Sequence, residues 1–526
     1  MYKYIIGLMG AVLLLAGTRE PVGANRIFDI KVHDINNVEI CITNIGKMGQ
    51  NQTGEAGCWW PTGSGQNYIY GAGIWFGARD SVAGDSVDTL VTIGYGPHGG
   101  EVEFAPGLSG QDPMPDYVMI YMYPDPWPAP VDTFPMAPQD VVSDQDSWCC
   151  YNDSNPNYHV PNDTRPIGVE VYQTVYAWDE PQVADIVFIT CEVKNVLGYD
   201  IKDCYYGICT DCDVGNEAGT AANDICTGIV DRWYVVDSES IRVNNLAYQW
   251  QEQVEPGWTS YPGVIGFDLL QTPFDLVPGD DKDEDGIPDE YECDSVYYWY
   301  NVPPNQWDAD GDGVPDWRDP SQWPQIGMTA LKRFTLSLEP NLDNERYLTL
   351  AGYNFQTMQY EPYDTMIPQP DDQRFMLACG PFDLAPDSTA TIIFAIMFAD
   401  WYGLYETPDT ALALVDQYAQ EWYDMYWYLY TGVEEYIGNT DGIVFSFTPN
   451  PVTDRAHLQF NLAQSCHVSV TVYNTAGQMV SRVVDEERLA GQHSIVIDTE
   501  GLSSGTYFTV LETESYMKTR SFVVLR

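Results

Sequence analysis

Residues 466–477 read Cys-His-Val-Ser-Val-Thr-Val-Tyr-Asn-Thr-Ala-Gly, and this stretch decides the fold expected for the end of the chain. Valines at 468, 470 and 472 alternate with more polar residues, as in a strand with one buried face. Further alternating pairs and turns follow the same plan, at Ile495 and Ile497, at Phe508 and Val510, and at the turns Asn450-Pro451, Ala476-Gly477, Ala490-Gly491 and Ser504-Gly505. Short strands at this spacing predict an Ig-like β-sandwich over residues 443–526.

Four short sequence motifs follow one another along this region, and a final apolar run is followed by a basic last residue, Arg526. The motifs are Pro449-Asn450-Pro451, Val472-Tyr473-Asn474-Thr475-Ala476-Gly477, Gly491-Gln492-His493 and Leu502-Ser503-Ser504-Gly505-Thr506-Tyr507. Together they resemble the C-terminal sorting domain of type IX secretion cargo. The resemblance implies that the type IX outer-membrane translocon recognises the tail and that the tail is then removed, often with attachment of the cargo to surface lipopolysaccharide.

The N-terminus has the order of a secretory signal peptide. Lys3 precedes an apolar run over residues 4–16, and small residues follow at 16–18 and 22–24. This order of charged, apolar and small residues predicts a signal over residues 1–24. A membrane anchor is the alternative, but the run is shorter than the roughly 20 residues of a spanning helix. Both ends of the chain therefore indicate a secreted or outer cell surface protein.

The composition favours a folded, extracellular protein. The chain has 23 basic and 77 acidic residues, a net charge of −54, which argues against nucleic acid and anionic membranes as partners. With 44% hydrophobic residues and 37 tyrosines, the chain is too apolar to be disordered. Cations are the natural counterpart of such a surface.

All twelve cysteines follow the signal segment, which fits an oxidising compartment and predicts disulfides without giving their pairing. Adjacent Cys149 and Cys150 could be bridged to each other or to separate partners. One cluster of cysteines has two metal-binding alternatives: Cys204, Cys209, Cys212 and Cys226. Its C-x4-C-x2-C spacing with a distant fourth cysteine is the ligand spacing of a plant-type iron-sulfur site, and the same four residues could hold a structural zinc. Export favours disulfides over both metals.

The body is expected to be mainly β and rich in β-sandwiches, with several domains and one long helix. Strands are predicted at 38–45, 68–76, 89–93, 168–178, 184–196, 205–209, 229–236, 348–353 and 391–398. Residues 106–166 are rich in Pro and Asp and predict a long connection rather than sheet. A helix is predicted at 408–430, capped by Thr407, with an apolar stripe facing a sheet: Leu414, Tyr418, Trp422, Met425 and Leu429.

We expect six segments along the chain. They are the signal (1–24), a first part of the β-rich body (25–277), a calcium-binding repeat insert (278–325), a second part of the body (326–431), a linker (432–442) and the sorting domain (443–526). Several phrases of the body resemble segments of large uncharacterised exported proteins with the same tail: Gly73-Ile74-Trp75-Phe76-Gly77-Ala78, Asp211-Cys212-Asp213-Val214-Gly215-Asn216, Gly263-Val264-Ile265-Gly266 and Gly380-Pro381-Phe382-Asp383. That resemblance supplies no catalytic residues.

The insert carries the most specific chemistry. Two stretches 27 residues apart, beginning at Asp281 and Asp308, follow the twelve-residue calcium loop with carboxylates at positions 1, 3, 5 and 12 and Gly at position 6. Pro288 and Pro315 at position 8 make them resemble thrombospondin type 3 repeats rather than paired EF-hands. The predicted calcium ligands are Asp281, Asp283, Asp285, Ile287, Asp289 and Glu292 in the first loop, and Asp308, Asp310, Asp312, Val314, Asp316 and Asp319 in the second.

The alternative for these loops is an acidic, solvated linker, but two matches to so constrained a pattern favour calcium. We expect calcium to order the segment, with an affinity of about 10⁻⁴ to 10⁻³ M as in extracellular modules. A weaker candidate for a further site combines Asp211 and Asp213 with Asn216, Asn223 and Asp224, residue types that also cluster in turns for backbone reasons.

No catalytic motif stands out. The chain has no H-E-x-x-H, no G-x-S-x-G and no P-loop, and only His33, His98 and His159 lie outside the tail. We therefore expect a non-enzymatic structural or adhesive protein. The alternative is a glycan-binding protein or glycoside hydrolase, because aromatic faces stack on sugars and the chain is rich in them, notably Trp59, Trp60, Trp75 and Trp127; core packing is the ordinary role of such rings.

Overall fold

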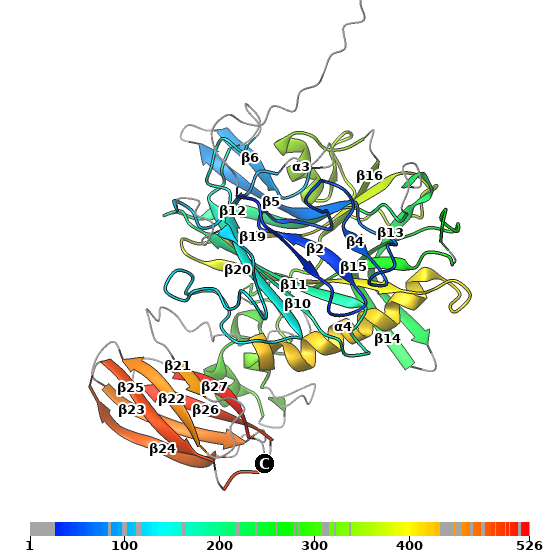
Figure 1. Ribbon diagram of the computed structural model, residues 1–526. Helices are drawn as coiled ribbons and strands as arrows, with labels where there is room; N and C mark the ends of the chain where they lie inside the picture. The colour runs from blue at the N-terminus through cyan, green and yellow to red at the C-terminus, as the bar shows by residue number, and fades with distance from the viewer. Residues whose placement is uncertain are drawn as a thin grey trace, which may run out of the picture.

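The computed structural model describes residues 27–524, apart from 83–85, 97–101, 112–117, 160–164, 216–220, 237–238, 259, 278, 282–284, 304–305, 308–314, 320–321, 336–337, 432–444, 449–454, 463–465, 475–478, 490, 500, 504 and 514–516. The expected signal segment and the expected linker at 432–442 lie outside these residues. The described chain is mainly β and built from antiparallel sheets with few helices, as the sequence predicts (Figure 1).

Two nine-stranded antiparallel sheets form the body of the described chain. The first has the order β1-β2-β3-β5-β12-β19-β16, with β4 paired to β2 and β6 to β5. Its strands are β1 (Ile30–His33), β2 (Glu39–Thr43), β3 (Lys47–Met48), β4 (Cys58–Trp59), β5 (Gly71–Val82), β6 (Ser86–Ile93), β12 (Ile201–Asp211), β16 (Ala330–Thr335) and β19 (Gln373–Leu384).

The second sheet has the order β13-β14-β15-β20-β11-β10-β9-β7, with β8 paired to β9. Its strands are β7 (Ala105–Pro106), β8 (Tyr121–Met122), β9 (Gln145–Asn152), β10 (Val169–Ala177), β11 (Ile186–Asn195), β13 (Ile225–Val236), β14 (Glu239–Trp250), β15 (Val264–Gln271) and β20 (Thr389–Ala399). Both sheets take strands from before and after residues 278–325, so that segment is an insertion into one sandwich.

The two sheets pack face to face, and strand alternation decides which side chains meet. Phe394 and Ile396 of β20 point into the core between the sheets, whereas Ala395 and Met397 point to the outer face under the long helix. Because successive residues of a strand face opposite sides, a strand that is covered on both faces must be apolar throughout. This explains the unbroken apolar run of β20.

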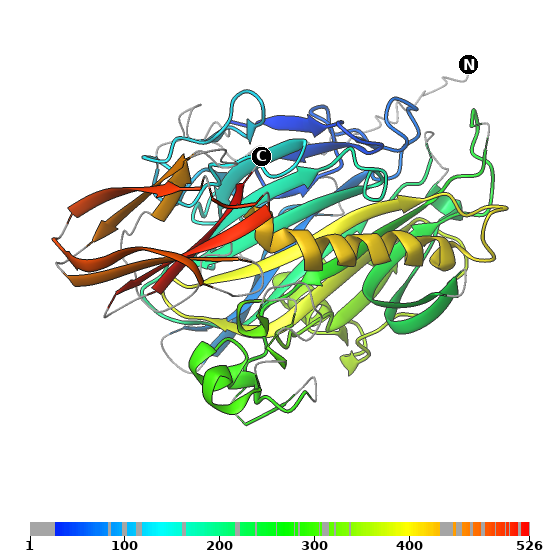
Figure 2. The same cartoon turned by 90° about the horizontal axis from the view of Figure 1, so that it is seen from below.

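Helices cover the outer faces. The long helix α4 (Pro408–Thr431) lies along the second sheet (Figure 2). The short helix α3 (Asp343–Leu350) covers the first sheet, where Tyr347 and Leu350 pack on Trp75 and Val91. The smaller elements are α2 (Ser295–Asn301), η1 (Ala221–Asn223), η2 (Asp289–Tyr291), η4 (Asp316–Arg318) and the hairpin of β17 (Tyr353–Asn354) and β18 (Gln359–Tyr360).

Helix α4 confirms the predicted helix, but its buried face differs from the predicted stripe. Leu412, Ala419 and Tyr423 are fully buried, while Tyr418 is 39% exposed. Asp416 also lies on the buried face and hydrogen-bonds to buried Asp268 of β15, and burial raises the pKa of both carboxyls. Leu414 and Trp422 of the predicted stripe pack at the edge of the same core, so the predicted stripe is offset from the centre of the buried face, and only Tyr418 of its described members is exposed. The side chains of Met425 and Leu429 lie outside the described residues.

Two other local expectations were wrong. Residues 348–353, predicted as a strand, form the end of α3 and the turn after it. The Glu345 carboxylate accepts the N–H of Leu342 at 3.2 Å and so caps the helix, and Gly352 ends it with φ of +80°. Within the Pro-rich segment 106–166, strand β9 is an interior, buried strand, because its own eight residues contain no proline.

The C-terminal residues form a separate β-sandwich, as predicted. A three-stranded sheet contains β21 (Phe445–Thr448), β22 (Arg455–Leu462) and β25 (Gly491–Asp498). A four-stranded sheet contains β24 (Met479–Arg488), β23 (Cys466–Asn474), β26 (Gly505–Thr513) and β27 (Met517–Val524). The alternating Val468, Val470 and Val472 face Leu458 and Ile497 across a shared core.

Candidate metal centres

The two calcium-loop sequences begin the same helical turn after position 8 and differ at position 12, where Glu292 is helical (φ −54°, ψ −39°) and Asp319 is extended (φ −109°, ψ 97°). Pro288 and Pro315 have nearly identical backbone angles (φ −66°, ψ 137° and φ −67°, ψ 139°), and each begins a single turn of 3-10 helix. The N–H of Asp289 donates to the carbonyl of Asp280 at 3.0 Å, and the N–H of Asp316 donates to that of Trp307 at 2.7 Å. These bonds are 27 residues apart, so the sequence repeat is also a structural repeat.

The short helical turn places two carboxylates of the first loop on one side. Positions 9 and 12 are three residues apart, and in the first loop the backbone stays helical through Glu292, so Asp289 and Glu292 lie above one another as residues i and i+3 of a 3-10 helix do, whereas Asp319 of the second loop directly follows its helical turn. Asp289 and Glu292 are each 1% exposed in the first loop, and Asp316 and Asp319 are 4% and 0% exposed in the second. Four predicted ligands are therefore buried.

Aromatic residues hold the two loops together. The Tyr298 hydroxyl of α2 donates to Glu292 at 3.2 Å, and the nearby charges of Glu292 and Asp316, after burial itself, raise its pKa. Its ring lies 5.1 Å from that of Trp317, between ring centroids. Tyr298 thus connects the last ligand position of the first loop to the helical turn of the second.

Of the other predicted ligands, Asp281 and Asp285 are exposed and Ile287 is buried. The Asp285 carboxylate accepts the N–H of Ile287 at 2.7 Å, and burial together with Asp281 and Asp289 raises its pKa. The remaining predicted ligands lie outside the described residues: Asp283, Asp308, Asp310, Asp312 and Val314. Residues 278–325 contain fourteen acidic and only two basic residues, so carboxylate oxygens far outnumber side-chain cations. This donor set suits calcium.

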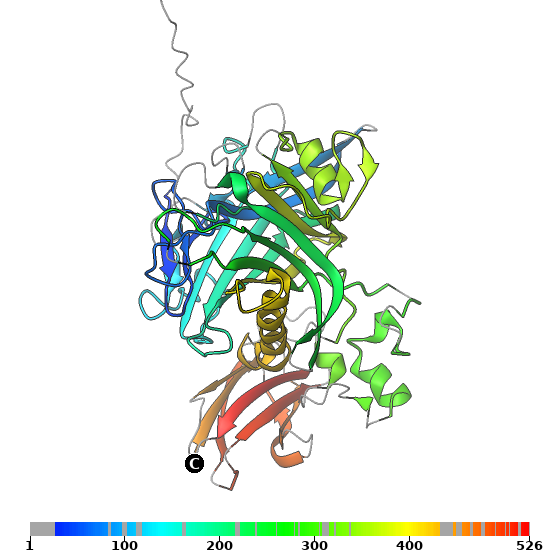
Figure 3. The same cartoon turned by 90° about the vertical axis from the view of Figure 1, so that its right-hand side faces the viewer.

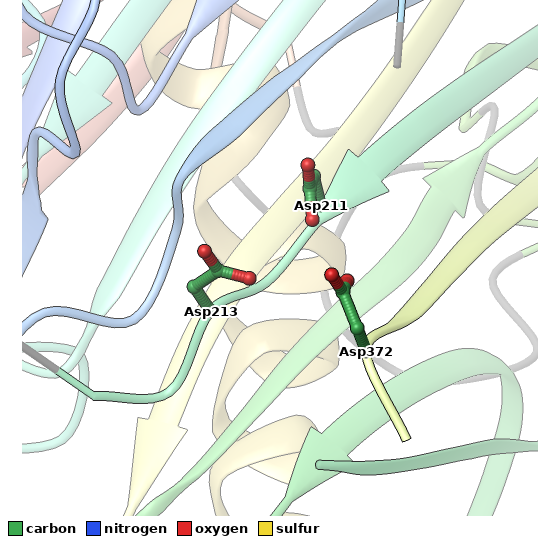
Figure 4. Close-up of side chains that lie close together, drawn as sticks. All are labelled: Asp211, Asp213 and Asp372. Carbon is green, nitrogen blue, oxygen red and sulfur yellow. The ribbon is translucent and has the colours of Figure 1, made fainter. Parts of the chain in front are cut away.

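A second acidic centre lies in the body, at the end of β12. Within the described residues, Asp211, Asp213 and Asp372 form the one group of three potential metal ligands whose oxygens approach within 4.8 Å of one another (Figure 4). The sequence singled out Asp211 and Asp213 but missed Asp372, which joins them because Arg374 of β19 pairs in register with Asp211. A cross-strand register has no signal in a single sequence.

A buried guanidinium already supplies positive charge to this acidic centre. Arg374 contacts Asp211 and Asp372 at 3.0 Å each and Glu339 at 3.1 Å. The Tyr95 hydroxyl also donates to Asp211 at 2.8 Å. Arg374 therefore acts as the structural counter-ion of this centre, which we call the Arg374 hub.

The hub has more carboxyls than one guanidinium can neutralise. Burial raises the pKa of Asp213 to about 7, with the charges of Asp211 and Asp372 adding to the effect and Arg374 opposing it. Burial likewise raises the pKa of Asp211 to about 6 and that of Glu339 to about 7, although Arg374 lowers both. Bound protons therefore balance part of the charge near neutral pH.

The structure shows no disulfide among the cysteines. All twelve are free thiols, and all except Cys293 are buried. Cys204 and Cys212 are eight residues apart along an extended chain, about 26 Å at roughly 3.3 Å per residue, which excludes a shared metal. Neighbouring Cys149 and Cys150 face opposite sides of β9. The expected disulfides are not seen, and the buried cysteines pack as small apolar core residues.

The described histidines outside the tail are buried structural groups. His33 Nε2 lies 2.7 Å from Ser147 Oγ, but His33 is 0% and Ser147 1% exposed, so no substrate can reach the pair. Burial lowers the pKa of His33 to about 3. His159 bonds to the carbonyl of Asp153 at 2.8 Å, and His98 lies outside the described residues.

The tryptophans named as sugar platforms do not form an exposed row. Trp75 is 0% and Trp60 5% exposed, and Trp60 stacks on Phe398 within the core. Trp59 and Trp127 are half-buried. Trp60 and Trp75 pack as core residues.

Comparison with known proteins assigns the C-terminal region to a family. Residues 446–525 match the family model of the secretion system C-terminal sorting domain. The chain is an exported protein. The type IX tail marks it for secretion or for attachment at the cell surface, and supports an interaction with the type IX secretion machinery.

No curated protein matches the chain. Among solved structures, a polysaccharide lyase has 6% identity and a TM-score of 0.21, with 96% of this chain and 47% of that chain covered. Dimeric latent PorU from Porphyromonas gingivalis has 8% identity and a TM-score of 0.15, with 95% and 34% covered. The chain thus spans less than half the length of either. Among the described helices, none combines the length and apolar character needed to cross a bilayer.

Proposed function

We propose that this exported protein is a structural or adhesive component of the bacterial cell surface whose insert is stiffened by calcium. The observation that carries the proposal is the structural repeat of the two loops, each of which buries its carboxylates at positions 9 and 12. Buried carboxylates need compensating positive charge, and the insert provides two basic residues against fourteen acidic ones.

In this proposal each loop holds one calcium ion through carboxylate oxygens and the carbonyl of position 7. The ion would neutralise the carboxylates and order a segment with little apolar core of its own. The insert projects from the side of the body (Figure 3), where ordered calcium loops would stiffen a surface feature. The first-loop ligands are Asp281, Asp283, Asp285, Ile287, Asp289 and Glu292, and the second-loop ligands are Asp308, Asp310, Asp312, Val314, Asp316 and Asp319.

Limited proteolysis of the purified full chain, in calcium and in a calcium chelator, tests the proposal. We expect the chelator to accelerate cleavage within residues 278–325 while the sheets of the body stay protected, with the cut sites mapped by mass spectrometry. Glu292→Gln should weaken calcium binding measured by titration calorimetry. Glu290→Gln, which removes the same charge two residues away from position 12, should not. Equal cleavage rates with and without chelator would refute the calcium role.

The fate of the tail is a separate part of the proposal. The sorting domain is expected to be removed after translocation, with the cargo attached to surface lipopolysaccharide or released. Mass spectrometry of the protein isolated from the cell surface locates its C-terminus. A surface protein that still carries residues 445–526 would contradict removal.

A further inference from the structure

A tyrosine-lined pocket lies on the outer face of the first sheet, beside α3. Its volume is about 460 Å³, within the range of roughly 300 to 1,000 Å³ usual for small-molecule sites. Tyr205 of β12, Tyr347 of α3 and Tyr353 of β17 contribute rings to its wall. Tyr205 and Tyr347 meet edge to face, with centroids 5.5 Å apart. Three separate elements therefore converge at one place, where Tyr205 and Tyr353 are half-buried and the largely buried Tyr347 packs against Tyr205.

An ion pair and an amide face the same pocket. Arg79 Nη1 of β5 lies 3.1 Å from Asp203 Oδ2 of β12, and the two side chains remain 47% and 46% exposed. Asn344, at the start of α3, is exposed and also lines the pocket. The pocket thus offers a carboxylate acceptor, guanidinium donors and an amide next to tyrosine rings.

Asp203 is fixed in an unusual conformation. Its φ of +48° is rare for a residue other than glycine. The N–H of Asp203 donates to Asp383 at 3.0 Å, and its carbonyl accepts the Tyr347 hydroxyl at 2.8 Å. The pairing of β12 with β5 also shifts register between Lys202 and Tyr205. Such bulges and strained residues concentrate at binding sites, because surrounding contacts hold a side chain in a chosen direction.

The charge of the pocket limits the chemical classes of ligand that it can bind. Arg79 is neutralised by Asp203, so the lining carries no net charge, and the whole chain carries −54. A phosphate or polyanion would meet no free cation. A quaternary ammonium would meet a guanidinium beside the rings, which opposes a cation–π cage. A neutral molecule with one apolar face and many hydroxyls fits both the rings and the polar groups.

We propose that this pocket binds a neutral saccharide, whose pyranose ring packs on Tyr205 and Tyr353 while its hydroxyls bond to Asp203, Arg79 and Asn344. The proposal does not depend on calcium in the insert, which lies at a different part of the body from α3 in Figure 3. It also differs from the sugar platform expected from tryptophans, since the rings here are tyrosines assembled by the fold.

The test uses the purified full chain, in calcium and again in chelator. Titration calorimetry with neutral gluco-, manno-, xylo- and galacto-oligosaccharides is compared with titration of uronic-acid oligosaccharides. We expect binding of at least one neutral series, in both buffers, and no preference for the acidic sugars. Absence of binding by every neutral series, or stronger binding of the acidic sugars, would overturn the proposal. Persistence of binding in chelator separates this site from the calcium loops.

Matched variants locate the site. Asp203→Asn keeps a residue that tolerates positive φ but removes the charged acceptor, and it should weaken binding about tenfold. Tyr353→Ala should also weaken binding about tenfold, whereas Tyr353→Phe keeps the ring and should bind within about threefold of wild type. Asp200→Asn and Tyr300→Ala, both exposed and outside the pocket, should bind as wild type. If Asp203→Asn binds as tightly as Asp200→Asn, the sugar does not occupy this pocket.

Discussion

Replacement of Asp213 by Asn should stabilise the folded protein at neutral pH and leave it almost unchanged in acid. Asp213 belongs to the Arg374 hub, where Asp211 and Asp372 repel its charge and burial disfavours it. Arg374 already contacts Asp211, Asp372 and Glu339, so little of its positive charge is available to stabilise the Asp213 carboxylate. Asn has nearly the same shape as Asp and stays neutral at every pH, which removes the cost of ionising this side chain inside the fold.

The size of the effect follows from the pKa shift. The pKa of Asp213 rises from 3.8 to about 7, about three units, and each unit is about 1.4 kcal/mol. Between these pH values the folded state holds a proton that the unfolded chain has released, so stability falls as pH rises from about 4 to about 7. Asp213→Asn should therefore exceed wild type in free energy of unfolding by about 4 kcal/mol at pH 8 and by less than about 1 kcal/mol at pH 4.

Urea unfolding followed by tryptophan fluorescence, at pH 4, 6 and 8, measures this difference. Asp132→Asn, which removes an exposed carboxylate in a surface turn, is the matched control and should shift the midpoint little at any of the three pH values. A difference between Asp213→Asn and wild type that is the same at pH 4 and pH 8 would show that Asp213 ionises normally. A difference that grows toward acid would reverse the sign and refute the reasoning.

Three further predictions concern the rest of the molecule. Calcium at 5 mM should stabilise the insert by about 1 to 2 kcal/mol for each site with an affinity of about 10⁻⁴ to 10⁻³ M, a gain that chelator reverses in thermal unfolding. Leu412→Ala on the buried face of α4 should lower the free energy of unfolding by about 2 to 5 kcal/mol, whereas Tyr418→Ala should change it far less because Tyr418 is 39% exposed. Equal losses of stability in the two variants would contradict this assignment of the buried face. Arg374→Met should destabilise the body by about 3 to 5 kcal/mol near pH 8, measured by urea unfolding, because it leaves buried carboxyls without their cation, and a smaller loss at pH 5 is expected since more of them are then protonated.

Local signals account for the parts of this protein that were predictable. The alternation at Val468, Val470 and Val472 predicted a strand, and β23 has this period and this buried face. Pro408 at the start of a helical pattern predicted α4 to within a residue at each end. In both cases the residues that carry the signal are neighbours in the chain. The predicted stripe on α4 lies at the edge of the buried face rather than at its centre, because an aromatic-rich helix has several apolar sides and only the sheet beneath it selects which one is buried.

The sequence by itself determined that the protein is exported and that it contains two repeated acidic loops, because residues that are contiguous in the chain carry both signals. Only the tertiary structure decided the rest. Asp372 joins Asp211 through the register of β19 on β12, and Arg79 meets Asp203 through that of β5 on β12. Pairing between distant strands is set by how two sheets bury their inner faces together, so the Arg374 hub and the tyrosine pocket exist only once the sandwich has formed.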